Sequence, residues 1–243
     1  MDGKLKKAAV VASLLFLGLG GFFLWVTLRL PNVSYLAREN PAETALEKER
    51  GGSGIRYWVS LDAISPRLVQ AVLMGEDAGF YFHAGFDTHE MKEAFKRNWE
   101  EGRTVRGAST ITQQLAKNLF LSPDRTYIRK LKEAVLTYRL EKALTKDRIL
   151  ELYLNVIEWG DGVYGAEAAA RNVFGKSASE LYAAEAATLA AMIPSPVRLD
   201  PCKSPKSVKV RRDRILHWMH GAGYLDDEAL ERALRENPEL SEC

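Results

Sequence analysis

Residues 65–77 read SPRLVQAVLMGED, and this stretch decides the fold class. Ser65 before Pro66 is the N-cap and first-turn signal of a helix, because the hydroxyl can accept a hydrogen bond from a free backbone amide and proline has no amide hydrogen to satisfy. Apolar residues then recur at helical spacing until Gly75: Leu68, Val69, Val72 and Leu73. The stretch predicts a helix that ends directly before Glu76.

The same helical signals recur after this stretch. Asp87 followed by Glu90 resembles a capping box, and a helix face continues through Asn98. Four further segments show the 3.6-residue period: 128–138, 149–153, 181–192 and a basic one at about 208–220. There is no run of alternating strand residues and no internal repeat. The fold class is therefore predicted to be mainly α.

Composition excludes several classes of protein. The 243 residues are 47% hydrophobic and 27% charged, which suits one domain with a sizeable core. The net charge of +2 comes from residues 1–7, so the rest of the chain balances at 31 basic and 31 acidic side chains and does not suit a nucleic-acid binder. Two cysteines cannot form a disulfide framework, and His217 with His220 is better explained as a polar helix face than as a metal site.

The N-terminus predicts a membrane anchor. Residues 8–28 are 21 residues without a charge, enough for a helix to cross the roughly 30 Å apolar core of a bilayer. No Ala-x-Ala cleavage pattern follows, so we expect the anchor to be retained. Lys4, Lys6 and Lys7 precede it, which places residues 1–7 in the cytoplasm and the remainder on the far side of the membrane.

The rest of the chain divides by composition into three parts. Residues 29–56 contain prolines and the run Gly51-Gly52-Ser53-Gly54, and are expected to form a stalk. Residues 57–225 hold the helical segments and are expected to form the functional domain. Residues 226–243 are expected to be an acidic tail.

Gly160-x-Gly162-x-x-Gly165 matches the dinucleotide-binding fingerprint, but it follows a helical pattern where that fingerprint requires a strand. Serine-nucleophile signatures are absent as well. Nucleotide-dependent and acyl-transfer chemistry are therefore both disfavoured.

Two polar stretches could carry chemistry. Glu76 and Asp77 lie among glycines and aromatics with Phe80 and His83, where partial burial would raise a carboxyl pKa and make a usable base; a solvated acidic loop is the alternative. Residues 107–118 collect hydroxyl, amide and ammonium groups that suit sugar hydroxyls and phosphate oxygens, although a polar helix face would look similar. The polar residues of interest there are Ser109, Thr110, Gln113, Gln114, Lys117 and Asn118.

Residues 92–133 hold ten basic and five acidic side chains, a local excess that suits a pyrophosphate. The cations of interest are Lys117, Arg125, Arg129 and Lys130. Arg129 and Glu133 could also be an ordinary ion pair one helical turn apart. A second basic stretch, 203–214, suits lipid head groups or plain solvation.

Together these motifs resemble the family-51 peptidoglycan glycosyltransferases, and most closely the monofunctional biosynthetic type. Five segments match the family motifs in order: Glu76-Asp77-x-x-Phe80-x-x-His83-x-Gly85, Gly107 to Asn118, Arg129-Lys130-x-x-Glu133, Lys146 to Asn155, and Gly162-x-x-Gly165 with Ala168-Ala169 and Phe174. The similarity covers about residues 58–224. Ala108 and Ile193 depart from the commoner glycine and leucine. The transpeptidase domain of bifunctional relatives is not expected here.

The resemblance implies a lysozyme-like helical lobe, a smaller membrane-dipping lobe and transfer of a lipid-pyrophosphate-linked glycan to the GlcNAc 4-hydroxyl of lipid II with inversion. By resemblance Glu76 is the general base, Lys117, Arg125 and Arg129 receive the pyrophosphate, and Glu133 positions those cations or a divalent metal. Lys130, Asp77, Phe80 and His83 join the substrate site with Ser109, Thr110, Gln113, Gln114 and Asn118.

The resemblance also implies surroundings and partners. It places the protein in a bacterial cytoplasmic membrane with its catalytic domain in the periplasm, acting on lipid II and lipid-linked glycan, and sensitive to moenomycin. No obligatory cofactor is expected; Mg²⁺ or Mn²⁺, and other cell-wall synthesis or division proteins as partners, stay open. Two alternatives are a lytic glycosidase, which would not need the basic band, and a non-enzymatic membrane scaffold, which would leave residues 107–118 without a purpose.

Overall fold

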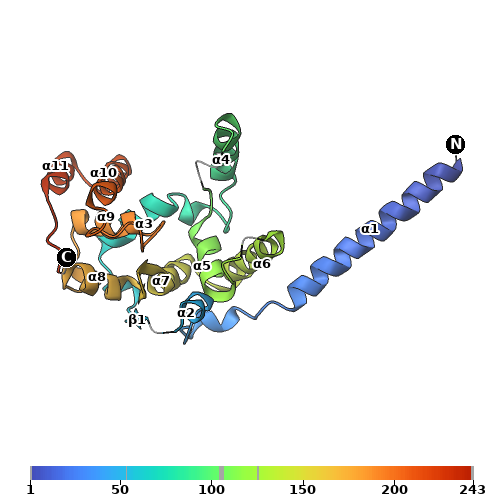
Figure 1. Ribbon diagram of the computed structural model, residues 1–243, viewed down its shortest axis with the longest axis horizontal. Coiled ribbons are helices and arrows are strands. Elements are labelled where there is room, and N and C mark those ends of the chain that lie inside the picture. The colour runs from blue at the N-terminus through green and yellow to red at the C-terminus, as the bar shows by residue number, and fades with distance from the viewer. Residues whose placement is uncertain (1, 53, 104–106, 125, 242–243) are drawn as a thin grey trace.

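The computed structural model describes residues 2–52, 54–103, 107–124 and 126–241. The chain is mostly helical, which confirms the predicted fold class (Figure 1). The α-helices are α1 Asp2–Leu28, α2 Ala45–Glu49, α3 Pro66–Glu76, α4 Thr88–Glu100, α5 Ile111–Phe120, α6 Tyr127–Ala143, α7 Lys146–Val156, α8 Ala166–Phe174, α9 Ala183–Met192, α10 Pro205–Gly221 and α11 Asp227–Arg235. The short 3₁₀ helices are η1 Ser34–Ala37, η2 Leu61–Ala63, η3 Phe80–Phe82 and η4 Ala178–Glu180.

The core is built around α9. Every residue from 184 to 192 is buried, and the helix packs against α3, α10 and α11. A second group, α5 with α6 and α7, lies beside it, and α7 and α8 join the two. As predicted, α3 begins with Ser65, whose hydroxyl accepts the Arg67 amide, but the helix includes Glu76 instead of ending before it. Glu76 therefore stands at the last turn of a buried core helix.

A small sheet was not expected from the sequence. Strands β1 Ile55–Arg56, β2 Glu158–Gly160 and β3 Val163–Tyr164 pair in the order β1-β3-β2. Strands this short are too brief to show an alternating pattern, so no strand signal is visible in the sequence. The glycine fingerprint is the β2–β3 hairpin and its exit: at Gly165, with φ +84°, a Cβ would lie 2.9 Å from the Asn155 carbonyl oxygen. Backbone packing, not a dinucleotide, requires this glycine.

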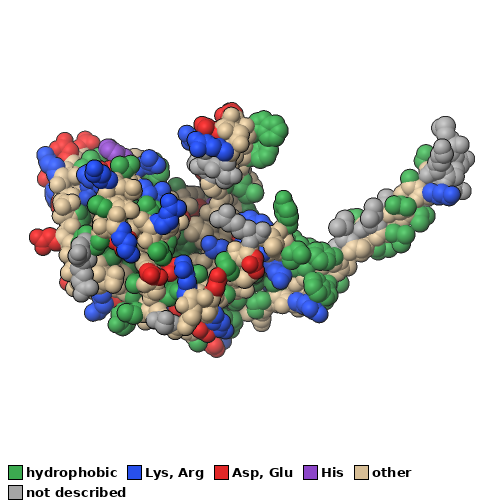
Figure 2. All heavy atoms as spheres, in the orientation of Figure 1, with side chains coloured by type: hydrophobic (Ala, Val, Ile, Leu, Met, Phe, Trp, Pro, Cys, Tyr) green, Lys and Arg blue, Asp and Glu red, His purple; other side chains and the backbone are tan. Residues whose placement is uncertain are grey.

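Helix α1 projects away from the body as a long rod covered with hydrophobic side chains (Figures 1 and 2). Its segment Lys7–Leu28 has a mean hydropathy of 2.3 and is long enough to cross a membrane, as expected for the anchor. Arg139 of α6 holds the end of this helix: its guanidinium donates to the carbonyl of Thr27 at 2.8 Å and to those of Leu30 and Pro31 at 3.2 Å. The rod is thus attached to the body by a defined set of hydrogen bonds.

Parts of the segments expected as a stalk and as an acidic tail contact the body. Before β1, Leu36 is fully buried and α2 packs against α5, while Arg56 donates to the Pro41 and Ala42 carbonyls. Near the C-terminus, α11 buries Leu230 and other apolar side chains against the body. In both segments the apolar residues are few and widely spaced, so their sequences resemble linkers.

Candidate active site

Glu76 is held by a chain of hydrogen bonds from two other helices. The side-chain amide of Gln114 on α5 donates to Glu76 Oε2 at 2.9 Å, and the hydroxyl of Tyr153 on α7 donates to Gln114 Oε1 at 3.0 Å. Burial and the nearby carboxylates raise the pKa of Tyr153 well above its usual value, so the phenol keeps its proton and stays a donor. Gln114 is thereby fixed with its amide group toward Glu76.

Burial raises the pKa of Glu76 above that of an ordinary carboxyl group, and the neighbouring Asp77 charge raises it further. The Gln114 hydrogen bond and the charges of Arg211 and Lys117 oppose this rise. A carboxylate with a raised pKa is a better proton acceptor than a solvated one. The sequence-based expectation of a usable base at this position therefore has a physical cause in the structure.

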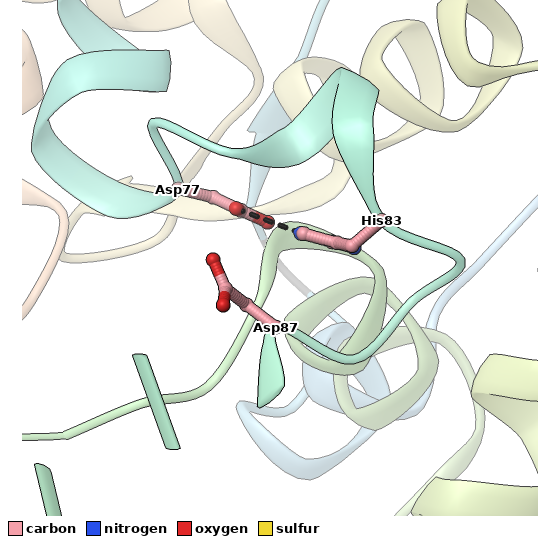
Figure 3. A group of neighbouring side chains, drawn as sticks. All are labelled: Asp77, His83 and Asp87. Atoms are coloured by element: carbon pink, nitrogen blue, oxygen red, sulfur yellow. Dashed lines mark hydrogen bonds and ion pairs between the residues drawn. The ribbon is translucent and has the colours of Figure 1, made fainter. Parts of the chain in front are cut away.

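Asp77 connects the loop after α3 to the start of α5 (Figure 3). Its Oδ1 lies 2.9 Å from His83 Nε2, and its Oδ2 accepts the backbone N–H of Ile111 at 2.9 Å. His83 Nδ1 accepts the Gly85 amide, so the ring proton is on Nε2 and points at Asp77. These residues fix the position of α5, and with it Gln114 and Lys117.

Asp77, His83 and Asp87 also bring their ligand-type atoms within 4.8 Å of one another. Both oxygens of Asp77 and both nitrogens of His83 are already used, and Asp87 Oδ1 accepts the Glu90 amide at the start of α4. Among the described residues Asp77 therefore bonds to His83, and Asp77 and Asp87 accept backbone amides at the starts of α5 and α4. We call Asp77, His83 and Asp87 the polar bracket.

The polar stretch 107–118 faces in two directions. Thr110 and Gln113 form a capping box at the start of α5 and are buried, so their side chains support the helix. Ser109, Gln114, Lys117 and Asn118 line cavities, and Thr110 also lines the second of these. The sequence could not separate these groups because a capping box and a binding motif use the same residue types.

Two clefts meet at Gln114. The first, of about 400 Å³, is lined by polar groups of α5 and α6, by Glu158 and by Arg50 of the segment after α2. The second, of about 800 Å³, contains Glu76 and is closed on one side by α10. Gln114 and Pro194 line both clefts. The candidate base therefore lies in one cleft, one side chain away from the other.

The first cleft is basic. Lys117 and Arg129 both line it, and burial lowers the pKa of Lys117 while the Glu133 carboxylate counteracts this. Arg129 donates to Glu133 Oε2 at 2.6 Å, and Lys130 forms a second ion pair with the same carboxylate. The Nε atom of Arg129 is buried and has no hydrogen-bond partner among the described residues. Arg129, which lines the cleft, therefore keeps one donor that no described residue satisfies.

Two of the remaining predicted site residues, Glu133 and Phe80, are buried. Glu133 is buried with both oxygens on cations, so it acts through Arg129 and Lys130. Phe80 is fully buried, and the ammonium of Lys146 lies 4.4 Å from the centre of its ring. Arg125 lies outside the described residues. The binding and catalytic roles themselves stay predictions.

Comparisons with known proteins show the family of this chain. Residues 43–220 match the family model described as Transglycosylase. The chain belongs to the transglycosylase family. It is 47% identical over 194 residues to the "Biosynthetic peptidoglycan transglycosylase" of Methylobacillus flagellatus, covering 79% of this chain and 83% of the relative, and 53% identical over 180 residues to the protein of that name from Nitrosospira multiformis, covering 74% and 78%.

Among solved structures, Penicillin-Binding Protein 1A from Haemophilus influenzae matches with a TM-score of 0.47 and 24% identity, covering 77% of this chain and 18% of that one. The family match agrees with the resemblance seen in the sequence, and it identifies the chain as a glycosyltransferase.

Sequence reasoning missed several residues of this transglycosylase site. Tyr153 lies inside a recognised motif, but its partner Gln114 is distant in sequence. Arg50 and Glu158, which pair at 3.0 Å, line the first cleft. Arg211 lines the second cleft, although the basic stretch that contains it was expected to meet lipid or solvent. No local pattern distinguishes Arg211 from its solvated neighbours.

Proposed function

We propose that this transglycosylase polymerises the glycan strands of peptidoglycan. In this scheme the donor is a growing chain linked to a lipid pyrophosphate, and the acceptor is the GlcNAc 4-hydroxyl of lipid II. The products are a glycan chain lengthened by a β-1,4 bond and undecaprenyl diphosphate. The configuration at the anomeric carbon of the donor is inverted. The observation that carries the proposal is the position of Glu76, which lies one side chain away from a cleft lined by Lys117 and Arg129.

The reaction balances with groups of this chain. Glu76 accepts the proton of the acceptor hydroxyl as its oxygen bonds to the anomeric carbon of the donor. The bond from that carbon to the pyrophosphate oxygen breaks, and its electron pair leaves on the pyrophosphate. Lys117 and Arg129 receive that charge, with Glu133 holding Arg129 in place. Arg125 is proposed as a further cation on the basis of the family resemblance.

The leaving group favours transfer over hydrolysis of finished glycan. A glycosidase must protonate a sugar oxygen and needs a second carboxyl group as general acid. Pyrophosphate leaves as a stable anion, so cations can replace that acid. The first cleft offers Lys117 and Arg129 to such an anion. It is also lined by Glu49 and Glu158, and Glu158 pairs with Arg50 at 3.0 Å.

The proposal also says which parts of the chain meet the membrane: the N-terminal helix and helix α4. The N-terminal anchor is proposed to cross the cytoplasmic membrane with residues 1–7 in the cytoplasm, so that the catalytic domain meets lipid II at the outer surface. Helix α4 projects from the body (Figure 1), and its Phe95 and Trp99 rings stack at 6.1 Å while 69% and 78% exposed. Figure 2 shows hydrophobic side chains on one side of this projecting helix. We propose that this lobe dips into the bilayer.

Incubation with labelled lipid II tests the function. Wild type should lengthen lipid-linked chains and release no fragments from finished peptidoglycan. Glu76→Gln should lower polymerisation by about two to four orders of magnitude while still binding a moenomycin-type inhibitor. Release of fragments without polymer would overturn the transferase assignment, and full activity of Glu76→Gln would overturn the base.

The cations are tested separately. Lys117→Ala or Arg129→Ala should each lose on the order of 2 to 4 kcal/mol of transition-state stabilisation, because one charge-assisted contact to the leaving group is removed. Lys206→Ala, which removes an exposed charge outside both clefts, is the matched control. Near-normal rates for both cleft variants would show that the basic band is only solvated.

A further inference from the structure

Arg211 is the one lysine or arginine that lines the second cleft among the described residues, and Glu76 lines the same cleft. It comes from α10, and its Nε–H donates to the Ala191 carbonyl at 3.1 Å, which fixes the guanidinium against the end of α9. The side chain is half-buried. Its two terminal NH₂ groups have no hydrogen bond or ion pair with any described residue.

The neighbouring arginines show that this arrangement is specific. Arg212 is buried, pairs with Asp213 at 2.7 Å and donates to the Glu236 carbonyl, so it holds the C-terminal segment in place. Arg214 is exposed and lines neither cleft. Of these three arginines, Arg211 is the one that lines a cleft and keeps donors with no partner among the described residues.

An anion in the second cleft would also stabilise the charge of Arg211. Burial lowers its pKa, and the charge of Glu76 is the stabilising influence that opposes this. When Glu76 takes up the substrate proton, that stabilisation is lost. A second negative group in the cleft would then compensate the half-buried cation.

The acceptor supplies such a group. In the proposed reaction the leaving pyrophosphate occupies the first cleft, and the acceptor hydroxyl must lie beside Glu76 in the second. The acceptor carries a pyrophosphate of its own and carboxylates on its stem peptide. We propose that Arg211 binds an oxyanion of the acceptor in the second cleft, an inference that rests on the proposed function. Both candidate oxyanions suit the planar, two-pronged guanidinium.

The test separates acceptor binding from donor binding. A labelled, preformed lipid-linked oligomer serves as donor at fixed concentration, and lipid II is varied as acceptor with the full-length protein. Arg211→Ala should raise the KM for the acceptor about 10- to 100-fold with kcat within a few-fold of wild type, and Arg211→Lys should recover part of the loss. Arg214→Ala, one turn along the same helix, should leave both values unchanged.

Binding of a moenomycin-type inhibitor to the first cleft should be the same in wild type and Arg211→Ala, which also shows that the variant is folded. Two acceptor analogues identify the anion: one without the pyrophosphate and one with its stem carboxylates amidated. The analogue whose KM is unaffected by Arg211→Ala lacks the group that Arg211 binds.

An unchanged acceptor KM in Arg211→Ala overturns the inference, and so does a loss of kcat with a shifted pH–rate profile at constant KM, because Arg211 would then act only on Glu76. If Arg211→Ala loses inhibitor affinity by the same factor as its acceptor KM rises, the inference is overturned as well. These results leave the proposed function intact as long as wild type elongates the oligomer. If wild type does not elongate it, the proposed function fails with the inference.

Discussion

At the scale of single residues, the site gains reactivity at a cost in stability. The pKa of Glu76 is raised in the folded chain, so the folded state holds its proton more tightly than the unfolded state. Stability from this group is therefore present at low pH and is lost as the pH rises through the raised pKa. Glu76→Gln cannot ionise and can still accept the Gln114 hydrogen bond. We expect its melting temperature to match wild type in acid and to exceed it at neutral pH; a lower value at neutral pH would contradict the idea.

The lowered pKa of Lys117 leads to a prediction for the alkaline side of the pH–rate profile. Burial lowers the pKa of its ammonium group, so the charge proposed to receive the pyrophosphate is lost at a lower pH than for a solvated lysine. Arginine stays protonated across this range. Lys117→Arg should therefore move the alkaline limb of polymerisation to higher pH, whatever it costs in maximal rate. Lys206→Arg should not move it. An unmoved limb in Lys117→Arg would show that another group titrates there.

At the scale of secondary-structure elements, Asp77 couples the end of α3 to the start of α5. Asp77→Asn leaves one oxygen to accept two bonds, those from His83 and the Ile111 amide, and turns an NH₂ group toward one of these donors. We expect a loss of about 1–3 kcal/mol in the free energy of unfolding, measured in urea, together with reduced activity as α5 moves. Asp87→Asn is the matched control, because asparagine caps a helix as well as aspartate does. Equal stability of both variants would mean that the Asp77 hydrogen bonds to His83 and to the Ile111 amide are unimportant.

Some secondary-structure elements could be predicted from the sequence and others could not. Ser65 and Asp87 were recognised as helix starts because caps and periodicity are local signals. The two- and three-residue strands carry no such signal, and neither does the packing of residues 29–56. Within the site, motif residues were found, but which of them face a cleft depends on contacts across the chain. The Glu76–Gln114–Tyr153 chain and the placement of Arg211 arise from such contacts.

At the scale of the whole molecule, Arg139 connects the anchor to the catalytic body. Its guanidinium binds the Thr27, Leu30 and Pro31 carbonyls, where the negative end of the α1 dipole favours a cation. Arg139→Ala should free the body to tilt relative to the membrane. Polymerisation of lipid II in vesicles should then fall about 3- to 10-fold, while the rate with detergent-dispersed lipid II stays near wild type, because loss of three hydrogen bonds worth about 1 kcal/mol each loosens the attachment without touching either cleft.

Deletion of residues 1–30 provides the decisive comparison. It removes the Thr27 and Leu30 carbonyls, so it should lower the ratio of vesicle rate to detergent rate at least as far as Arg139→Ala does. Arg139→Ala made in the deleted chain should then have little further effect, because interacting changes are not additive. Additive losses in the doubly changed chain would mean that Arg139 serves the body itself. In that case the anchor would only keep the enzyme near its substrate, and its orientation would not matter.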